Sequence, residues 1–315
     1  MPKAAHIFRY RVRNWRAYNH ALINRGRLTI WFDEQATMTW RNTEPGRGPG
    51  APRIYSDLAI DCALVFKAVY HLSLRGAQGF LSSVVELMKL TLPIPDYSTV
   101  SRRQGTQHVR LPVESGGCPR HVVIDATGLK VYGAGDWHGR KHQVGRRRTW
   151  RKLHLGIDEA TKEIVAVDLT ESRVHDSQRV SSLPKQIPDP IGQVSGDGAY
   201  DTRAYYEAVL QHGAAPTFVP RCTAQPGAIP KPTGWRAARN RILQQIEQQG
   251  RYAWRVVSGC TRQSIAENTM FRFKSLFGGR LWARGLDTQR TEAQVKCSVL
   301  NRMTQLGMPE TVREG

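Results

Sequence analysis

The order of apolar patterns after the first third of the chain most constrains its fold. A short β-branched run at 121–127 is typical of a buried strand, and two further strands are expected at 150–158 and 163–170. Helical patterns then alternate with apolar runs that end at Asp197 and Pro220. Strands that alternate with helices predict an α/β layered domain with helices on both faces of a sheet.

In chain order the predicted elements are three strands, a helix, a strand, a helix, a strand and a helix, which is the order of a ribonuclease H-like domain. We therefore predict a mixed five-stranded sheet with flanking helices over residues 119–306. One helical segment is expected from about Asp176, and the polar, basic stretch 221–262 is predicted to be an insertion. The last helix is predicted at 287–306, and the tail 307–315 is expected to fray.

A stretch rich in Pro and Gly divides the chain before this domain. Residues 1–53 are predicted to be a basic arm and linker, whose interleaved Arg and aromatic side chains suit either nucleic acid or packing on the core. Residues 54–115 predict three helices, the first capped by Ser56, that resemble a helix-turn-helix module. The third helix of such a module enters the major groove, so Arg102 and Arg103 are candidate DNA contacts, although a plain three-helix bundle gives the same pattern.

The balance of charge favours a polyanionic partner. Lys and Arg number 46 against 26 Asp and Glu, which gives a formal net charge of +20. Neutralising phosphates releases counterions and supplies most non-specific affinity for nucleic acid. No run of 18 apolar residues, secretory signal or basic amphipathic helix is found, which argues against a membrane partner. We expect a cytoplasmic, nucleoid-associated protein, and its five scattered cysteines predict reduced thiols rather than disulfides.

Three acidic residues are the candidates for chemistry on a phosphodiester. Asp125 lies in the first predicted strand, Asp197 ends the fourth, and Glu267 lies on the helix after the insertion. A charge among the apolar neighbours of Asp125 is costly unless it is paired or binds a metal. Carboxylates are the ligands that Mg²⁺ prefers, and two divalent ions can activate the attacking oxygen and stabilise the leaving one.

Four segments resemble bacterial insertion-sequence transposases of the DDE class. They are residues 123–132, 196–201 and 267–280, and residues 300–309 resemble the group of insertion sequence five in particular. The resemblance covers about residues 10–310. It implies a ribonuclease H-like catalytic domain with an Asp-Asp-Glu metal site and recognition of terminal inverted repeats in double-stranded DNA. It also implies action as a multimer, and a homodimer on two DNA ends is expected.

The mechanism that we predict has two steps at one site. Asp125, Asp197 and Glu267 hold two Mg²⁺ ions, for which Mn²⁺ is expected to substitute. Hydrolysis at the transposon end frees a 3′ hydroxyl, which then attacks target DNA in line. Two other classes remain open: a nuclease of the same fold that never joins strands, and an inactive repressor that only binds DNA.

Basic residues around the acids are predicted to hold the DNA backbone. Lys274 lies two turns after Glu267 on the same helix face, and a basic loop between the first two strands also bears Trp137 and Trp150. Members of the wider superfamily often carry Tyr and Arg before the glutamate. The predicted DNA contacts from these regions are Lys274, Arg146, Arg147, Arg148, Lys152 and Arg262, where Arg262 stands one position from the expected arginine and Cys260 and Gln263 occupy the expected places.

Overall fold

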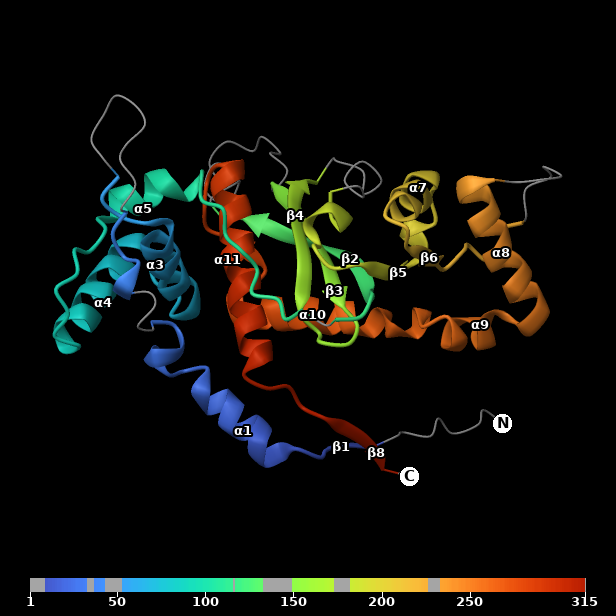
Figure 1. The fold of residues 1–315 in the computed structure, drawn as a ribbon, viewed down its shortest axis with the longest axis horizontal. Coiled ribbons are helices and arrows are strands. Elements are labelled where there is room, and N and C mark those ends of the chain that lie inside the picture. The colour runs from blue at the N-terminus through green and yellow to red at the C-terminus, as the bar shows by residue number, and fades with distance from the viewer. Residues whose placement is uncertain are drawn as a thin grey trace, which may run out of the picture.

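The computed structural model describes residues 9–32, 37–42, 53–115, 117–132, 149–172, 182–225 and 233–314. Figure 1 shows a helical domain at one end, a layered α/β body beside it, and an arm in which the first and last described residues lie together. Three predicted features fall outside the described residues: the Pro- and Gly-rich linker over 43–52, most of the basic loop, with Trp137, and the start of the helix expected from Asp176.

The central sheet has the strand order β4-β3-β2-β5-β6, and the short β7 pairs with the end of β2. β3 runs antiparallel to β2 and β4, whereas β5 and β6 are parallel to β2. This mixed order confirms the predicted ribonuclease H-like class, with β7 as an addition that the sequence pattern did not predict. The strands are β2 (Arg120–Val131), β3 (Trp150–Asp158), β4 (Ile164–Glu171), β5 (Ile191–Gly196), β6 (Ala215–Phe218) and β7 (Arg280–Leu281).

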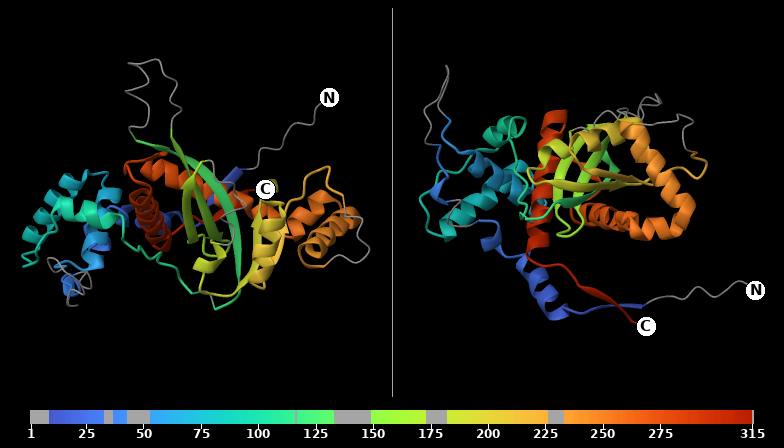
Figure 2. Two further views of the ribbon diagram at one scale, coloured as in Figure 1. Left: turned by 90° about the horizontal axis from the view of Figure 1, so that it is seen from above. Right: turned by 45° about the vertical axis from the view of Figure 1, so that its right-hand side comes forward.

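Helices cover both faces of the sheet because neighbouring residues of a strand point in opposite directions. Val123 and Leu129 of β2 pack in the core that contains α10 and α11, whereas Val122 and Ile124 pack on the side of α7 and α8. The left view of Figure 2 shows α10 and α11 on one side of the sheet and α7 on the other. The helices of the body are α7 (Arg203–Gln211), α8 (Gly234–Gln249), α9 (Arg251–Val257), α10 (Gln263–Phe277) and α11 (Leu286–Gln305).

Each helix of the helical domain begins at a side-chain cap. The predicted cap at Ser56 is confirmed, since its hydroxyl accepts a hydrogen bond of 3.2 Å from the backbone N–H of Ala59. Ser73 and Asp96 cap the next two helices in the same way. The helices are α3 (Asp57–Val69), α4 (Leu74–Leu87) and α5 (Tyr97–Gln104).

The predicted insertion is helical and is fixed to the body by a charged contact. Arg239 of α8 donates two hydrogen bonds, of 2.9 and 3.0 Å, to the carboxylate of Asp201 ahead of α7. Trp254 of α9 is buried, and its indole N–H donates to the side chain of Gln245. Residues 234–257 therefore form two helices, α8 and α9, that pack on the α7 side of the sheet.

The arm joins the two ends of the described chain. β1 (Arg9–Val12) pairs antiparallel with β8 (Thr311–Glu314), and α1 (Trp15–Asn24) follows β1. The side chain of Asn14 donates to the carbonyl of Met308 and accepts from the N–H of Glu310. The tail after residue 307 was expected to fray, but the structure pairs four of its residues because β1 supplies hydrogen-bond partners.

Within the described residues, no helix combines the length and the apolar character that a membrane crossing requires.

One buried arginine ties the start of β2 to its surroundings. The guanidinium of Arg120 is bonded to the carboxylates of Asp158 and Asp189 and to the carbonyl of Glu114. The side chain of Arg120 is 2 % exposed and that of Asp158 is 4 % exposed, so water cannot replace either partner.

We predict that Arg120→Ala lowers the free energy of unfolding by about 3–5 kcal/mol, because it leaves the Asp158 carboxylate buried without its counter-charge. Urea denaturation measures this. The control is Arg203→Ala, which breaks the exposed pair with Glu207 and should cost less than about 1 kcal/mol. Equal losses in the two variants would contradict the structural role given to Arg120.

Candidate active site

The pairing of β2 with β5 places two of the predicted acids at the same level. In this parallel pair Val123 lies opposite Ser195. Asp125 and Asp197 each follow two residues later, so both lie on the side of the sheet that Val123 faces. Adjacent strands are about 4.8 Å apart. The backbone therefore brings Asp125 and Asp197 together where β5 ends.

Asp197 is held by a tight turn at the end of β5. Its carboxylate accepts a hydrogen bond of 2.9 Å from the N–H of Ala199, which starts a 3-10 turn over Gly198–Tyr200. A Cβ on Gly196 would lie 3.0 Å from the ring of Tyr200 and 3.1 Å from Ile124. A larger residue would press on both side chains, so glycine suits this close turn, which leaves the Asp197 side chain exposed.

Asp125 is half-buried in the middle of β2. Its carboxylate accepts a hydrogen bond of 2.7 Å from the N–H of Ala126, and it lies opposite Leu155 of β3. The N–H contact stabilises the ionised form, which offsets part of the desolvation cost among apolar neighbours.

Helix α10 brings Glu267 to the same face of the sheet. The chain enters this helix through Gly259, whose φ of +76° is the left-handed conformation that glycine favours, and a Cβ there would lie 3.2 Å from the His121 ring. At the first turn of α10 the side-chain amide of Gln263 donates to the carbonyl of Ile124 at 3.3 Å. Glu267 lies one turn further along the same side of the helix and is exposed, while Ala266 is buried against the sheet.

The three carboxylates are a donor set that fits a divalent cation of the magnesium type. All three offer hard oxygen ligands. Asp197 and Glu267 are exposed, and Asp125 and Asp197 each follow the paired residues Val123 and Ser195 by two positions. In the part of the chain that the structure describes, however, no three His, Cys, Asp or Glu side chains lie close enough together to hold a metal ion. The backbone puts the three acids on one face of the sheet, but their side chains do not meet around a common point.

The basic residues predicted to contact DNA lie in different surroundings. Lys274 is exposed on α10, two turns after Glu267. Arg262 forms an ion pair of 3.2 Å with Glu159 beside the start of β2. Lys152 of β3 is half-buried and lies opposite Gly128. The remaining predicted contacts of this loop lie outside the described residues: Arg146, Arg147 and Arg148.

The two arginines of α5 differ in their availability. Arg102 is exposed in the last turn of the helix and donates to the neighbouring hydroxyl of Thr99. Arg103 donates to the carbonyl of Tyr55 and forms an ion pair with Asp57. Arg103 therefore ties α5 to the start of α3, and Arg102 is the arginine directed to solvent.

The polar contacts that β2 and β5 make just before the two aspartates were not predicted from the sequence. His121 and Ser195 face each other across the β2–β5 pair, with 2.9 Å between Nε2 and Oγ, and the Gln193 amide donates to the carbonyl of Ser258. These contacts fasten the segment before α10 to the sheet. The one signal in the sequence was Gln263 at the position where a superfamily arginine was expected, and that side chain does contact β2.

Two family models, each described as a transposase DDE domain, match this chain over residues 23–134 and 116–302. The second match spans more than half of the chain and contains all three predicted acids. The chain belongs to the DDE transposase family. It is therefore an enzyme of the DDE transposase type, and the narrower assignment to the insertion sequence five group stays a prediction.

Two solved transposase structures are similar to this DDE transposase. One is the cryo-EM structure of a piggyBac transposase synaptic complex with hairpin DNA, with 11% identity, a TM-score of 0.35, and coverage of 90% of this chain and 73% of that chain. The other is the crystal structure of a pre-cleavage Mos1 transpososome, with 9% identity, a TM-score of 0.21, and coverage of 72% and 82%. At these scores no residue can be transferred from either structure.

We predict that this transposase loses stability in mild acid partly through His121. Burial lowers the pKa of His121 below its ordinary 6.5, although the nearby charges of Glu159 and Asp158 oppose the shift. Below pH 6.5 His121 therefore becomes protonated in the unfolded chain before it does so in the folded chain. The free energy of unfolding falls as the pH is lowered, until the pH passes the folded pKa of His121.

Urea denaturation at several values between pH 7.5 and 5 tests this in wild type and His121→Gln. The variant should show a shallower fall in the free energy of unfolding, whereas the exposed control His212→Gln should follow wild type. The same dependence of the free energy of unfolding on pH in all three proteins would show that burial does not lower the pKa of His121.

Proposed function

We propose that this DDE transposase binds the terminal inverted repeats of an insertion sequence and catalyses metal-dependent strand cleavage and strand transfer into target DNA. The observation that supports the proposal is the β2–β5 register, in which Val123 and Ser195 lie opposite each other, each two residues before one of the aspartates. The contact of Gln263 with Ile124 supports Glu267 as the third metal ligand, because it holds the helix that carries Glu267 against the same face of the sheet.

Asp125, Asp197 and Glu267 would hold the divalent ions, with Mg²⁺ as the physiological metal and two ions as the expected number. When bound, such ions lower the barrier by stabilising negative charge on the attacking and leaving oxygens. The chain's own contribution is placement. Backbone N–H groups fix one oxygen each of Asp125 and Asp197, and the buried face of α10 fixes the backbone of Glu267.

The reaction is a pair of in-line displacements at phosphorus. Water attacks the phosphate at the transposon end, the bond to the 3′ oxygen breaks, and that oxygen leaves as a 3′ hydroxyl after taking a proton. The freed hydroxyl then attacks a target phosphate, forms the new ester bond and releases a target 3′ hydroxyl. Such chemistry depends on positioning and electrostatics, so Lys274 serves by holding a phosphate beside the carboxylates.

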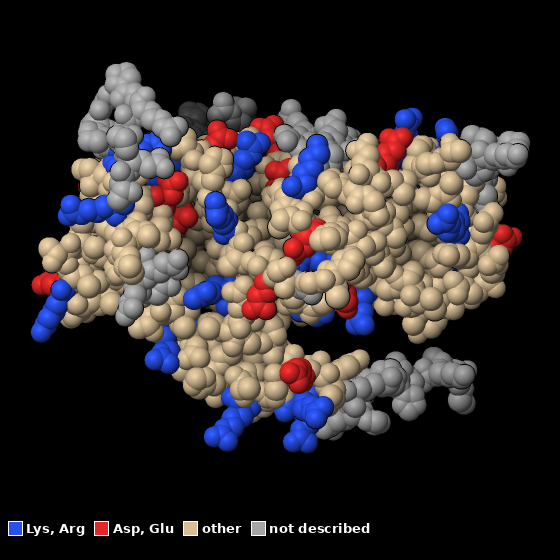
Figure 3. Space-filling model, in the orientation of Figure 1, with Lys and Arg blue, Asp and Glu red and all other residues tan. Residues whose placement is uncertain are grey.

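Double-stranded DNA is the partner that the charge of the surface supports. The net charge is +20, and the arm carries exposed Arg11, Arg13 and Arg16. In Figure 3 Lys and Arg side chains are scattered over the visible face and project from the arm. Arg102 on α5 supplies a contact from the helical domain. Because two ends must be joined to one target, a homodimer on DNA is the expected working form.

We predict that Asp197→Ala, Asp125→Asn and Glu267→Gln each reduce cleavage of a labelled transposon-end duplex by at least about a hundredfold, since each removes a metal ligand. The assay contains target plasmid and Mg²⁺ or Mn²⁺, and it scores nicking and joining separately. The controls Asp287→Asn and Glu247→Gln change exposed acids on other helices and should retain wild-type activity.

The same assay separates the proposal from its rivals. Nicking without joined product would identify a nuclease of this fold, and binding without cleavage in either metal would identify a repressor. Loss of activity in Asp197→Ala but not in Glu267→Gln would show that Glu267 is not a metal ligand and that another residue takes this role.

We predict that Arg102→Ala weakens binding to terminal-repeat and unrelated duplexes alike if Arg102 contacts a phosphate. The slope of log affinity against log salt should become shallower by about 1. Fluorescence anisotropy at several salt concentrations measures both. Arg203→Ala, an exposed arginine on α7, is the control. A loss confined to the terminal repeat would instead assign Arg102 to base recognition.

A further inference from the structure

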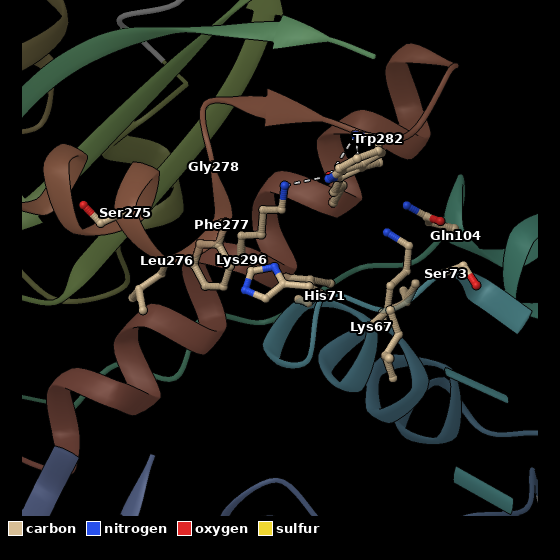
Figure 4. Close-up of a pocket in the computed structure, with 15 residues that line it drawn as sticks. Lys67, His71, Ser73, Gln104, Ser275, Leu276, Phe277, Gly278, Trp282 and Lys296 are labelled. Carbon is tan, nitrogen blue, oxygen red and sulfur yellow. Dashed lines mark hydrogen bonds and ion pairs between the residues drawn. The ribbon is translucent and has the colours of Figure 1, made fainter. Parts of the chain in front are cut away.

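A cavity of about 730 Å³ lies between the helical domain and the α/β body. Its walls come from α3 and the turn after it, from α5, from the end of α10 and from α11 (Figure 4). Pockets of about 300–1,000 Å³ with apolar walls and a few convergent polar groups are typical of small-molecule sites. The larger apolar side chains that line it are Leu64, Leu72, Leu276, Phe277, Trp282 and Val295.

The only carboxylate among the lining residues, that of Glu292, is already fully engaged. It accepts hydrogen bonds from the backbone N–H groups of Trp282 and Ala283 and forms an ion pair of 2.7 Å with Lys296. The Lys296 ammonium also donates to the carbonyl of Arg280. This pair is internally neutral, so its oxygens and ammonium have little capacity left for other groups in the cavity.

Lys67 brings a second positive charge that the surroundings do not neutralise. Among the described residues, none forms a hydrogen bond or ion pair with its ammonium. Figure 4 shows the Lys67 side chain rising from α3 into the space between Trp282 and Gln104. Burial lowers the pKa of Lys67, and the charge of Glu292 offsets only part of this effect. An anion in the cavity would supply the missing counter-charge.

We propose that this cavity binds a nucleoside phosphate. The phosphate pairs with Lys67, and the base lies against the apolar walls and the half-exposed ring of Trp282. The hydroxyl of Ser73 can donate to a phosphate oxygen, and the side-chain carbonyl of Gln104 can accept from the edge of a base. The site is separate from the acids, because Phe277 lies ten residues, or about 15 Å, along α10 from Glu267.

The same chemistry has two sources, a free mononucleotide or the terminal nucleotide of a DNA strand. Calorimetric titration of the full chain distinguishes them with four probes. The first two are deoxyadenosine monophosphate and deoxyadenosine, and the others are a short single strand with and without a 5′ phosphate. Each probe is titrated into wild type, Lys67→Met and the control Lys185→Met, which removes an exposed lysine that does not line the cavity.

Lys67→Met should weaken binding of the phosphorylated probe at least about tenfold and leave the unphosphorylated probe unchanged, whereas Lys185→Met should match wild type. The variant should melt at or above the wild-type temperature, because it removes a half-buried charge that Glu292 offsets only in part. Should it fail to fold, Trp282→Ala tests the same site through the half-exposed ring.

Tighter binding of the mononucleotide supports a free nucleotide, and tighter binding of the phosphorylated strand supports the end of a DNA strand. Wild type that binds neither at millimolar concentration, or Lys67→Met that binds both as wild type does, overturns the proposal. DNA cleavage is read separately, so a protein that cleaves through Asp197 but binds no nucleotide would refute this site alone.

Discussion

The parallel pairing of β2 with β5 is the interaction on which the candidate site depends. It sets Val123 opposite Ser195 and so fixes the height of both aspartates, and slipping by one residue would turn one of them to the other face. The register shifts once, between Arg120 and His121, just where the buried Arg120 contacts Asp158 and Asp189. The ion pairs of Arg120 therefore hold the register at the start of β2, and this register sets the positions of the two aspartates along their strands.

Several acidic residues of this very basic chain form ion pairs, which leaves few of them available for chemistry. Asp158, Asp201 and Glu292 are each bound by a basic partner and lie in the interior or against it. Asp197 and Glu267, by contrast, are exposed on the face that Asp125 shares. Positive charge elsewhere draws a polyanion to the surface, and we propose that these acids then bind the cations that such a substrate requires.

The body could be predicted from the sequence because its strands are apolar and its helices are periodic. The same pattern predicted that Asp125 lies in a strand and that Asp197 ends one, whereas the choice of Glu267 as their partner also depended on family resemblance. β7 and β8 were not predicted, since a two-residue strand and an exposed one leave no alternating pattern. The contact between Gln263 and Ile124 joins residues far apart in the chain, and no local rule of spacing reveals it.

The apolar core does not stop at the boundary between the helical domain and the body. One continuous cluster runs from Phe32 and Trp40 through α3 to α11 and the strands, and Asn301 of α11 bonds the backbone of Pro112 and of Ile164. The chain before residue 115 therefore shares its interior with the catalytic body. Cut at that point, the three helices would expose the face of α3 that α11 covers, and the two halves behave as one cooperative folding unit rather than as modules that evolution or an experimenter could exchange freely.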